Sequence, residues 1–412
     1  MKRIPEFVQG IGYRINKLIK SPKFKRYLPL AVVLVLALGT LVTCVAKTRP
    51  EPDPDPSRPG IVEPTASLTP QPSTPSTLPT SPSPDPDPDP DPGPDPDPDP
   101  YSGPRNPLTG IPTDADISQK RPLAIMINNI SAAQPQVGIS RADILYEIPV
   151  EGGVTRMLAI FQDTTDVGVI GSIRSARPYY VDIAQSYDAI FIFAGASEQA
   201  YTVLRNRNIT HLDGVNGRQT QIYYRDPNRA GMAIEHRLVT SGARIAEHFP
   251  TYNFRFDLEE GYERALSFAE EGTPESGAPA LDFTVSYSSG KSTSFRYNAE
   301  EGLYYLSQKM RGFDGPYRDG NDNSQLSVTN VLILQTSVSR IPGDGHNRLR
   351  VTTTGDGSGY FVCGGMYVEV NWSRENDSAQ FRYTLKDGSD LVLGQGSTYI
   401  CIVPKEVSVE IS

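Results

Sequence analysis

One long segment of this chain can build no hydrophobic core, and it confines any folded domain to the residues after it. From Lys47 to Pro104 the sequence is mostly Pro, Asp, Ser and Thr, and it includes the run SPSPDPDPDPDPGPDPDPDP. Proline favours extended polyproline II structure and the regularly spaced aspartates repel one another, so we expect a disordered Pro/Asp-rich linker at 47–104. Such a linker would reach on the order of 150 Å, enough to cross part of a cell wall. The alternative is a linker that only keeps the chain soluble.

The segment before this linker has the pattern of a membrane anchor. Residues 1–26 carry eight Lys and Arg against one acidic residue, Glu6, and Tyr27–Ala46 is uncharged and mostly apolar. About 20 such residues span a bilayer as a helix, and the basic flank stays in the cytoplasm. We therefore expect a basic cytoplasmic head at 1–26, a membrane anchor at 27–46, and a folded part on the extracytoplasmic face of the plasma membrane.

A lipid anchor fits the same segment. Leu41-Val42-Thr43-Cys44 is similar to a bacterial lipobox, which makes Cys44 a candidate for lipidation. Thr43 departs from that motif, in which Gly, Ala or Ser usually precedes the cysteine, and the long basic lead favours a transmembrane helix. A cleaved secretory signal is a third alternative, although its apolar region is normally about 7–15 residues long. The transmembrane helix and the lipid anchor leave the protein on the same outer face.

The rest of the chain, from Arg105 to Ser412, is long enough for two domains of ordinary size. Its first part mixes strand and helix patterns, which predicts an N-terminal α/β domain at 105–260. The expected strands are 123–127, 144–150, 155–161 and 189–193, the middle two forming a hairpin, and the expected helices are 175–186, 197–205 and 237–248.

Beyond a loop-like stretch, short runs rich in Val, Tyr and Phe alternate with Gly, Asn and Asp. This spacing predicts a mainly antiparallel β-rich C-terminal domain at 281–412, either an open sheet or a small barrel, and places the whole folded part in the α+β class. The expected strands are 283–287, 294–297, 328–336, 348–354, 359–363, 367–372, 381–385, 389–393 and 398–403.

Charge and cysteine content narrow the range of functions. The chain has a net charge of −9, and its folded part stays acidic once the basic head and the acidic linker are set aside. We therefore expect no nucleic-acid partner. Cys363 and Cys401 are the cysteines of the folded part; they either form one disulfide outside the cell or remain two buried thiols on strands.

A cluster of charged residues interrupts the apolar stretch ADILYEIPVEGGVTRMLAIFQ. In an extended strand Glu147 and Glu151 point to one face, and a two-residue turn at Gly152-Gly153 would place Pro149 opposite Arg156. Arg156 would then lie within reach of both carboxylates. Such a cluster is either a carboxylate pair for acid–base catalysis, an arginine that binds a ligand carboxylate, or an ion-pair network that holds the hairpin.

The segment GSIRSARPYYVD indicates an anion-binding site. We predict that Ser175 caps a helix whose first amides are free to bind an anion, with Arg174 and Arg177 as bidentate donors on either side. Asp182 lies further along the same helix and is another candidate ligand-binding residue. No G-x-S-x-G motif frames Ser175, so a serine nucleophile is disfavoured.

The histidines predict neither a metal site nor a cofactor, because their spacing matches no ligand motif; they are His211, His236, His248 and His346. In YYRDPNRAGMAIEHR, Arg225, Asp226 and His236 belong to a polar loop that could close over the arginines, with His236 as a proton donor or acceptor. The alternative for His236 is a solvated surface position.

Several segments together resemble the YerB-like bacterial lipoprotein family: NPLTGIP, RPLAIMINN, ADILYEIPVEGGVTRMLAIF, GSIRSARPYYVD, AGAS, and the ending GYFVCGGMYVEVNW…DGSDLVLGQGSTYICIVP. The resemblance covers nearly all of 105–404. It implies an extracytoplasmic protein of Gram-positive-type bacteria with an N-terminal α/β and a C-terminal β domain. The family is of unknown function, so the resemblance implies no reaction.

Carried over position by position, the family's polar signature falls on Glu147, Glu151, Arg156, Arg174, Ser175, Arg177, Asp182, Arg225, Asp226 and His236. The chain departs from the family at Phe193 and Tyr317, where histidines are common. It departs again at Glu235 and Arg237, because the family usually has Pro-His-Asn around the histidine. These losses weaken any metal-dependent or histidine-dependent mechanism.

Three functions remain open on this basis. The first is a surface-anchored protein whose arginine and carboxylate cluster binds an anionic wall component, such as a peptidoglycan stem or a wall polymer. The second is a wall hydrolase or transferase that uses Glu147 or Glu151 with His236 as catalytic residues. The third is a structural adaptor for membrane-bound wall-synthesis enzymes.

Overall fold

The computed structural model describes residues 102–217, 221–407 and 409–411. The expected head and anchor, Cys44, and the linker up to residue 101 lie outside the described residues. No helix within the described ranges is long and apolar enough to cross a membrane.

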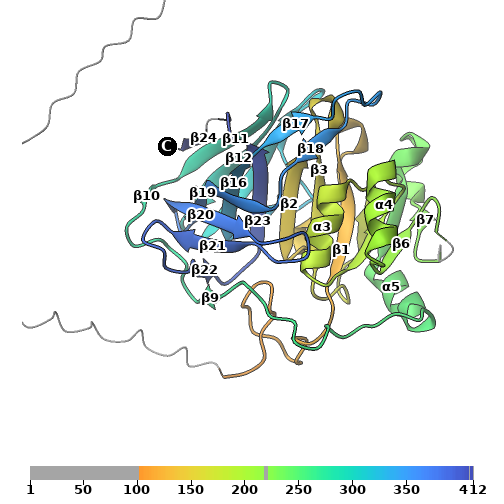
Figure 1. Ribbon diagram of the computed structural model, residues 1–412, viewed down its shortest axis with the longest axis horizontal. Coiled ribbons are helices and arrows are strands. Elements are labelled where there is room, and N and C mark those ends of the chain that lie inside the picture. Colours follow the sequence, from red (N-terminus) through yellow and green to blue (C-terminus); the bar gives the residue numbers. More distant parts are fainter. Residues whose placement is uncertain (1–101, 218–220, 408, 412) are drawn as a thin grey trace, which may run out of the picture. The chain divides into compact units, whose positions relative to one another are not determined.

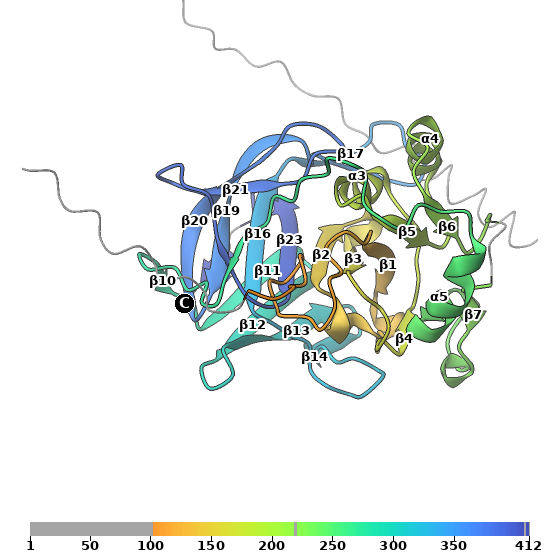
Figure 2. The same ribbon diagram turned by 90° about the horizontal axis from the view of Figure 1, so that it is seen from below.

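One large sheet runs through both halves of the folded part (Figures 1 and 2). Its strands, in spatial order, are β10 (Ala278–Pro279), β20 (Met366–Arg374), β19 (Gly355–Cys363), β16 (Asn330–Thr336), β23 (Thr398–Pro404), β2 (Ile144–Pro149), β3 (Thr155–Phe161), β1 (Leu123–Asn129), β5 (Ile190–Phe193) and β6 (His211–Asp213), and β21 (Arg382–Leu385) pairs with β20. We call it the central sheet.

The two halves of the sequence meet where β2 pairs with β23. The two strands run parallel, with Glu147 opposite Cys401, so hydrogen bonds continue from the N-terminal half into the C-terminal half. On the other side β1, β5 and β6 are also parallel to one another, so their carboxyl ends lie at one edge of the sheet.

A second sheet covers one face of the central sheet (Figure 2). Its strands are β14 (Phe313–Pro316), β13 (Leu303–Met310), β12 (Lys291–Asn298), β11 (Asp282–Ser288) and β24 (Val409–Ile411), with β15 (Ser327–Val328) paired to β13. Alternate side chains of β12 are buried, as expected of a strand with one face against a core. Phe295 of this strand packs edge-on against Tyr399 of the central sheet.

Two helices cover the opposite face of the central sheet: α3 (Pro178–Ser186) and α4 (Glu198–Asn206). Tyr180 and Ile183 of α3 and Leu204 of α4 are buried in the same apolar cluster as Met126 and Phe191 of the sheet. Ser197 caps α4, since its hydroxyl accepts a hydrogen bond from the Ala200 amide.

The remaining elements are short. The strands are β4 (Val169–Gly171), β7 (Tyr224–Arg225) and β8 (Leu238–Ser241), which form one small sheet, and the pairs β17 (Val338–Arg340) with β18 (Leu349–Val351) and β9 (Phe268–Ala269) with β22 (Leu393–Gly394). The helices are α5 (Gly242–His248) and the 3-10 turns Ser131–Ala133, Ile139–Arg141, Glu151–Gly153, Pro227–Arg229, Ile234–His236 and Phe249–Thr251.

The α+β expectation is confirmed as a β-rich fold with few helices. The helix expected at 237–248 is wrong in its first third, because β8 occupies Leu238–Ser241 and Ser241 then caps α5 through the Arg244 amide. Strand β13 was not expected at all. Cys363 and Cys401 are buried free thiols, which is the second of the two alternatives for these residues.

Candidate functional site

The hairpin of β2 and β3 does not have the predicted register. Arg156 lies opposite Ile148 rather than Pro149, because residues 150–154, which include the 3-10 turn Glu151–Gly153, replace the two-residue turn. Side chains alternate between the faces of a strand, so this one-residue shift moves Arg156 to the face opposite Glu147. The prediction that Arg156 lies between Glu147 and Glu151 is therefore wrong.

Glu147 points between the two sheets and is fully buried. Its Oε1 atom lies 2.9 Å from Nζ of Lys291 on β12. Hydroxyl and amide groups saturate the remaining positions of the carboxylate: Thr155, Thr293, Tyr399 and Asn129. Burial acts to raise the pKa of Glu147, but Lys291 and these donors outweigh it and lower that pKa. Glu147 is thus part of an interior network.

Glu151 belongs to a different cluster at the end of β2. The Nε atom of Arg177 donates to its Oε2 at 3.1 Å, and a second guanidinium nitrogen of Arg177 contacts Oε1. Arg156 lies 3.7 Å from the same carboxylate. Burial opposes ionisation of Glu151, yet the hydrogen bond and charge of Arg177 lower its pKa. One carboxylate therefore serves two arginines.

Arg156 itself is partly buried, with 13% of its side chain exposed. Its guanidinium donates to the backbone oxygen of Ser175 at 2.8 Å. Burial, followed by repulsion from Arg177, lowers the pKa of Arg156 to about 10, despite the opposing attraction of Glu151. At the end of β2, two guanidinium charges therefore face the single carboxylate charge of Glu151.

Ser175 does not cap the helix, which corrects the prediction. Helix α3 begins at Pro178, and its N-cap is Arg177, which makes no side-chain capping hydrogen bond. Proline is favoured at the first helical position and excludes the preceding residue from the helical region, so Arg177 is extended, with φ −129° and ψ 160°.

The backbone of Arg174 is fixed by hydrogen bonds, whereas its guanidinium group is not. Its amide donates to the Met126 oxygen at 3.0 Å, and its carbonyl accepts from the Ala194 amide at 3.1 Å. Its half-buried guanidinium has no hydrogen bond or salt bridge within the described part of the chain. Burial lowers the pKa of Arg174; the exposed Glu235 opposes this and Arg177 adds to it.

His236 lies beside Arg174 and is buried, not solvated. The amide nitrogen of Asn128 donates to Nδ1 of His236 at 3.2 Å, and Asn128 is paired with Arg156 across β1 and β3. Burial and then the charge of Arg174 lower the pKa of His236. The polar loop therefore brings His236 to the arginines, as the sequence suggested.

Three other candidates have local partners instead. Arg225 is exposed and donates to the Ile234 oxygen at 2.7 Å. Asp226 caps the 3-10 turn Pro227–Arg229. Asp182 pairs with Arg207 at 2.8 Å, and burial, with Asp377 adding, raises its pKa to about 6.

Two residues that the sequence reasoning missed support the site. Asn128 is the second-last residue of β1 and binds His236. Asp213 ends β6 and orders the loops after β5 and β6 by accepting from the amides of Gly195 (2.7 Å) and Val215 (2.9 Å). Both stand at the carboxyl ends of parallel strands, where ligands commonly bind in α/β sheets. For Asn128 the available signal was an Asn directly after the apolar run LAIMI; Asp213 follows no such run.

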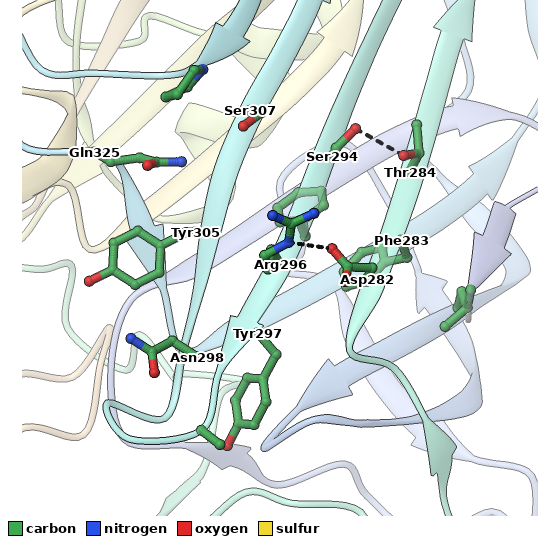
Figure 3. A pocket seen from close by; sticks show the side chains of 14 residues that line it. Asp282, Phe283, Thr284, Ser294, Arg296, Tyr297, Asn298, Tyr305, Ser307 and Gln325 are labelled. Carbon is green, nitrogen blue, oxygen red and sulfur yellow. Dashed lines mark hydrogen bonds and ion pairs between the residues drawn. The ribbon is translucent and has the colours of Figure 1, made fainter.

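One further feature lies apart from these arginines. A hollow of about 940 Å³ lies on the second sheet (Figure 3). Among the residues that line it, Arg296 is hydrogen-bonded to Asp282 and Thr284 to Ser294. No group of three or more metal-binding side chains occurs among the described residues.

Fold and site together define a β-rich protein with an arginine cluster at the carboxyl edge of its central sheet. The chain belongs to the family described as "Protein of unknown function (DUF3048)": the N-terminal domain of that family matches residues 108–255 and the C-terminal domain matches 283–400. The predicted family is thereby confirmed.

Two comparisons with YerB of Bacillus subtilis agree with this assignment. The protein named "Putative lipoprotein YerB" from Bacillus subtilis (strain 168) is 28% identical over 307 residues, which cover 74% of this chain and 88% of that relative. The crystal structure of YerB protein from Bacillus subtilis matches with a TM-score of 0.63 and 25% identity, and covers 74% of this chain and 99% of that chain.

Proposed function

We propose that this protein is a membrane-anchored, extracytoplasmic protein of the cell envelope that binds an anionic wall component at its arginine and carboxylate cluster, with Arg174 as the residue that contacts the anion. One observation carries the proposal. The guanidinium of Arg174 is half-buried without a hydrogen-bond partner in the described structure, while the carboxylate of the cluster, Glu151, is already occupied by Arg177 and Arg156.

The balance of charge favours an anion as the missing partner. Glu151 already serves both Arg156 and Arg177, and repulsion from Arg177 contributes to the lowered pKa values of Arg156 and Arg174. The exposed Glu235 attracts Arg174 but forms no salt bridge with it in the described structure. A carboxylate or phosphate at Arg174 would receive two parallel N–H donors and relieve this repulsion.

The same contacts favour binding over acid–base catalysis. Glu147 is closed between two sheets and bound to Lys291, and Glu151 is held by arginines that keep it ionised. Neither carboxyl group is positioned to exchange a proton with a ligand at Arg174.

The location rests on the sequence of the N-terminal part and on the relative's name. The basic head, the uncharged run at 27–46 and Cys44 support an anchor, and YerB is named as a lipoprotein. Protease added to intact protoplasts should remove the folded part; recovery of full-length chain from cytosol would contradict this. Release of the Cys44→Ser variant from membranes, or an unprocessed precursor, would indicate a lipid anchor, and no change a transmembrane helix.

The binding proposal is tested by co-sedimentation of the folded part, residues 102–412, with purified walls. The YerB crystal chain corresponds to this part over 99% of its length, so it can be studied without the anchor. Arg174→Ala should bind at least tenfold more weakly than the parent, while Arg350→Ala, which removes an exposed arginine from β18, should not. Walls stripped of phosphate polymers distinguish a peptidoglycan carboxylate from a wall-polymer phosphate.

Two further measurements refine this test. Arg174→Lys should restore only part of the binding, because a point charge cannot form the bidentate fork. Binding should also weaken as salt rises, since a half-buried ion pair is screened. If both variants at position 174 are folded and bind like the parent, the proposal fails and the adaptor function gains weight.

A further inference from the structure

The interior between the two sheets holds a cluster that anion binding does not use. Lys291 begins β12 and points inward with a side chain only 1% exposed, and its Nζ lies 2.9 Å from Oε1 of Glu147. The Nδ2 atom of Asn129, at the end of β1, donates to the same Oε1 at 2.9 Å. The amine and the carboxamide therefore meet on one carboxylate oxygen, and their nitrogens are separated by at most twice that distance.

The carboxamide of Asn129 is held in a defined orientation. Its Nδ2 also donates to the Thr155 hydroxyl at 2.9 Å, and its Oδ1 accepts from the hydroxyl of Tyr317 at 2.9 Å. Burial raises the pKa of Tyr317, so this phenol stays neutral and remains a donor. A donor on the carbonyl oxygen makes the amide carbon more electrophilic and would stabilise negative charge that develops there.

Glu147 is fixed just as firmly. Its Oε2 accepts from the hydroxyls of Thr293 and Tyr399, each at 2.7 Å, so Oε1 is left to face Lys291 and Asn129. Each of these side chains is buried. Groups that a rigid interior holds on the same carboxylate oxygen gain the rate advantage of an intramolecular reaction.

Burial also favours the reactive form of the amine. A charged pair in an apolar interior is costly, and burial lowers the pKa of Lys291 although Glu147 opposes the shift. Transfer of the ammonium proton to Glu147, which works against the lowered pKa of that carboxyl group, gives a neutral amine beside a neutral acid as the less populated, reactive form. A desolvated lysine in this form is a nucleophile.

We propose that Lys291 and Asn129 form an intramolecular isopeptide bond, with Glu147 as the catalytic acid and base. Nζ of Lys291 attacks Cγ of Asn129, and the carbonyl oxygen takes up negative charge against Tyr317. Glu147 passes a proton from Nζ to Nδ2, the Cγ–Nδ2 bond breaks, and ammonia leaves. One C–N bond forms and one breaks, so the reaction needs no oxidant or other co-reactant.

The bond would tie the second sheet to the central sheet. It joins β12 to β1 across a long stretch of sequence, and closing a long loop restricts the unfolded chain. The cysteines of the described part, Cys363 and Cys401, are both free, so a disulfide does not provide this restraint.

The test is a peptide-level mass measurement on the full-length chain purified from membranes. After proteolysis under denaturing conditions, we expect a branched peptide that contains residues 129 and 291, with the mass of its two parts less one ammonia. Recovery of both peptides unlinked and at their sequence masses would overturn the proposal. A branch from Lys291 to Glu147, with loss of water, would overturn the role given to Asn129.

Matched variants identify the reacting groups. Lys291→Arg and Asn129→Ala should each yield only unlinked peptides, and Lys309→Arg, on the exposed part of β13, should leave the branched peptide in place. Asn129→Asp should lose water instead of ammonia and give a linked peptide of parental mass. Because the mass of the parent chain decides the question, variants that fail to fold do not obscure it.

Discussion

Arg174 and Arg177 lie three residues apart and have opposite surroundings. Arg177 donates to both oxygens of Glu151, whereas Arg174 has no hydrogen-bond partner in the described part of the chain. Arg177 is fixed in place by an internal carboxylate, whereas the guanidinium of Arg174 is available to hydrogen-bond a ligand. This difference is the basis of the proposed anion site.

The imidazole of His236 should report the charge at Arg174. Burial and Arg174 both lower its pKa, so Arg174→Ala should raise the pKa towards, but not up to, its ordinary value of 6.5. A bound anion should act in the same direction. An NMR titration measures the shift, with the exposed His346 as internal control. No change at His236 in Arg174→Ala would show that the two groups are not coupled.

The same depressed pKa links His236 to stability. A histidine that stays neutral in the folded protein contributes stability above about pH 6.5, which is lost as the pH falls through its folded pKa. Arg174→Ala should therefore make this acid-side loss smaller.

Breaking the two charge clusters should have unequal costs. Lys291→Met removes the cation of the buried Glu147 in an unlinked chain and the bond to Asn129 in a linked one. Either loss should lower the free energy of unfolding by about 3–5 kcal/mol. Arg156→Met removes one of two arginines from Glu151 and leaves the Ser175 carbonyl unbonded, which should cost about 1–3 kcal/mol. Urea unfolding measures both. Equal costs, or a larger cost for Arg156, would contradict the assignment of Glu147 to Lys291.

Asp182 should make stability fall towards neutral pH. Its pKa is raised from 3.8 to about 6, mainly by burial and then by Asp377, so its contribution is full below about pH 4 and is lost as the pH rises through 6. The two-unit shift corresponds to at most about 3 kcal/mol. Asp182→Asn keeps an oxygen for Arg207 and should flatten the curve between pH 4 and 7. Parallel curves for variant and parent would contradict this.

Local sequence patterns predicted most strands near the charged cluster but not how they pair. Thr155–Phe161 has the predicted bounds, because its continuous apolar run MLAIF stops at the polar Gln162. Its register with β2 depends on the loop, where Gly152 and Gly153 both adopt positive φ and lengthen the turn. A shift of a single residue then reassigns every side chain to the other face.

The partner of Glu147 could not be found from local pattern. Lys291 precedes the polar run STS and looks like a solvated residue at the start of a strand. Only the packing of the second sheet on the central sheet brings it to Glu147. The start of α3, by contrast, could have been predicted from the sequence. Pro178 directly after Arg177 favours a helix that begins at Pro178, and therefore a cap at Arg177 rather than at Ser175.

The central claim is that Arg174 binds the anionic group of a wall component. Diffraction from crystals of the folded part grown with a purified, anionic wall fragment tests it most directly. We predict carboxylate or phosphate oxygens within hydrogen-bond distance of the Arg174 guanidinium, with Arg177 still on Glu151. A fragment bound only elsewhere, for instance in the hollow of the second sheet (Figure 3), with Arg174 uncontacted, would contradict the account.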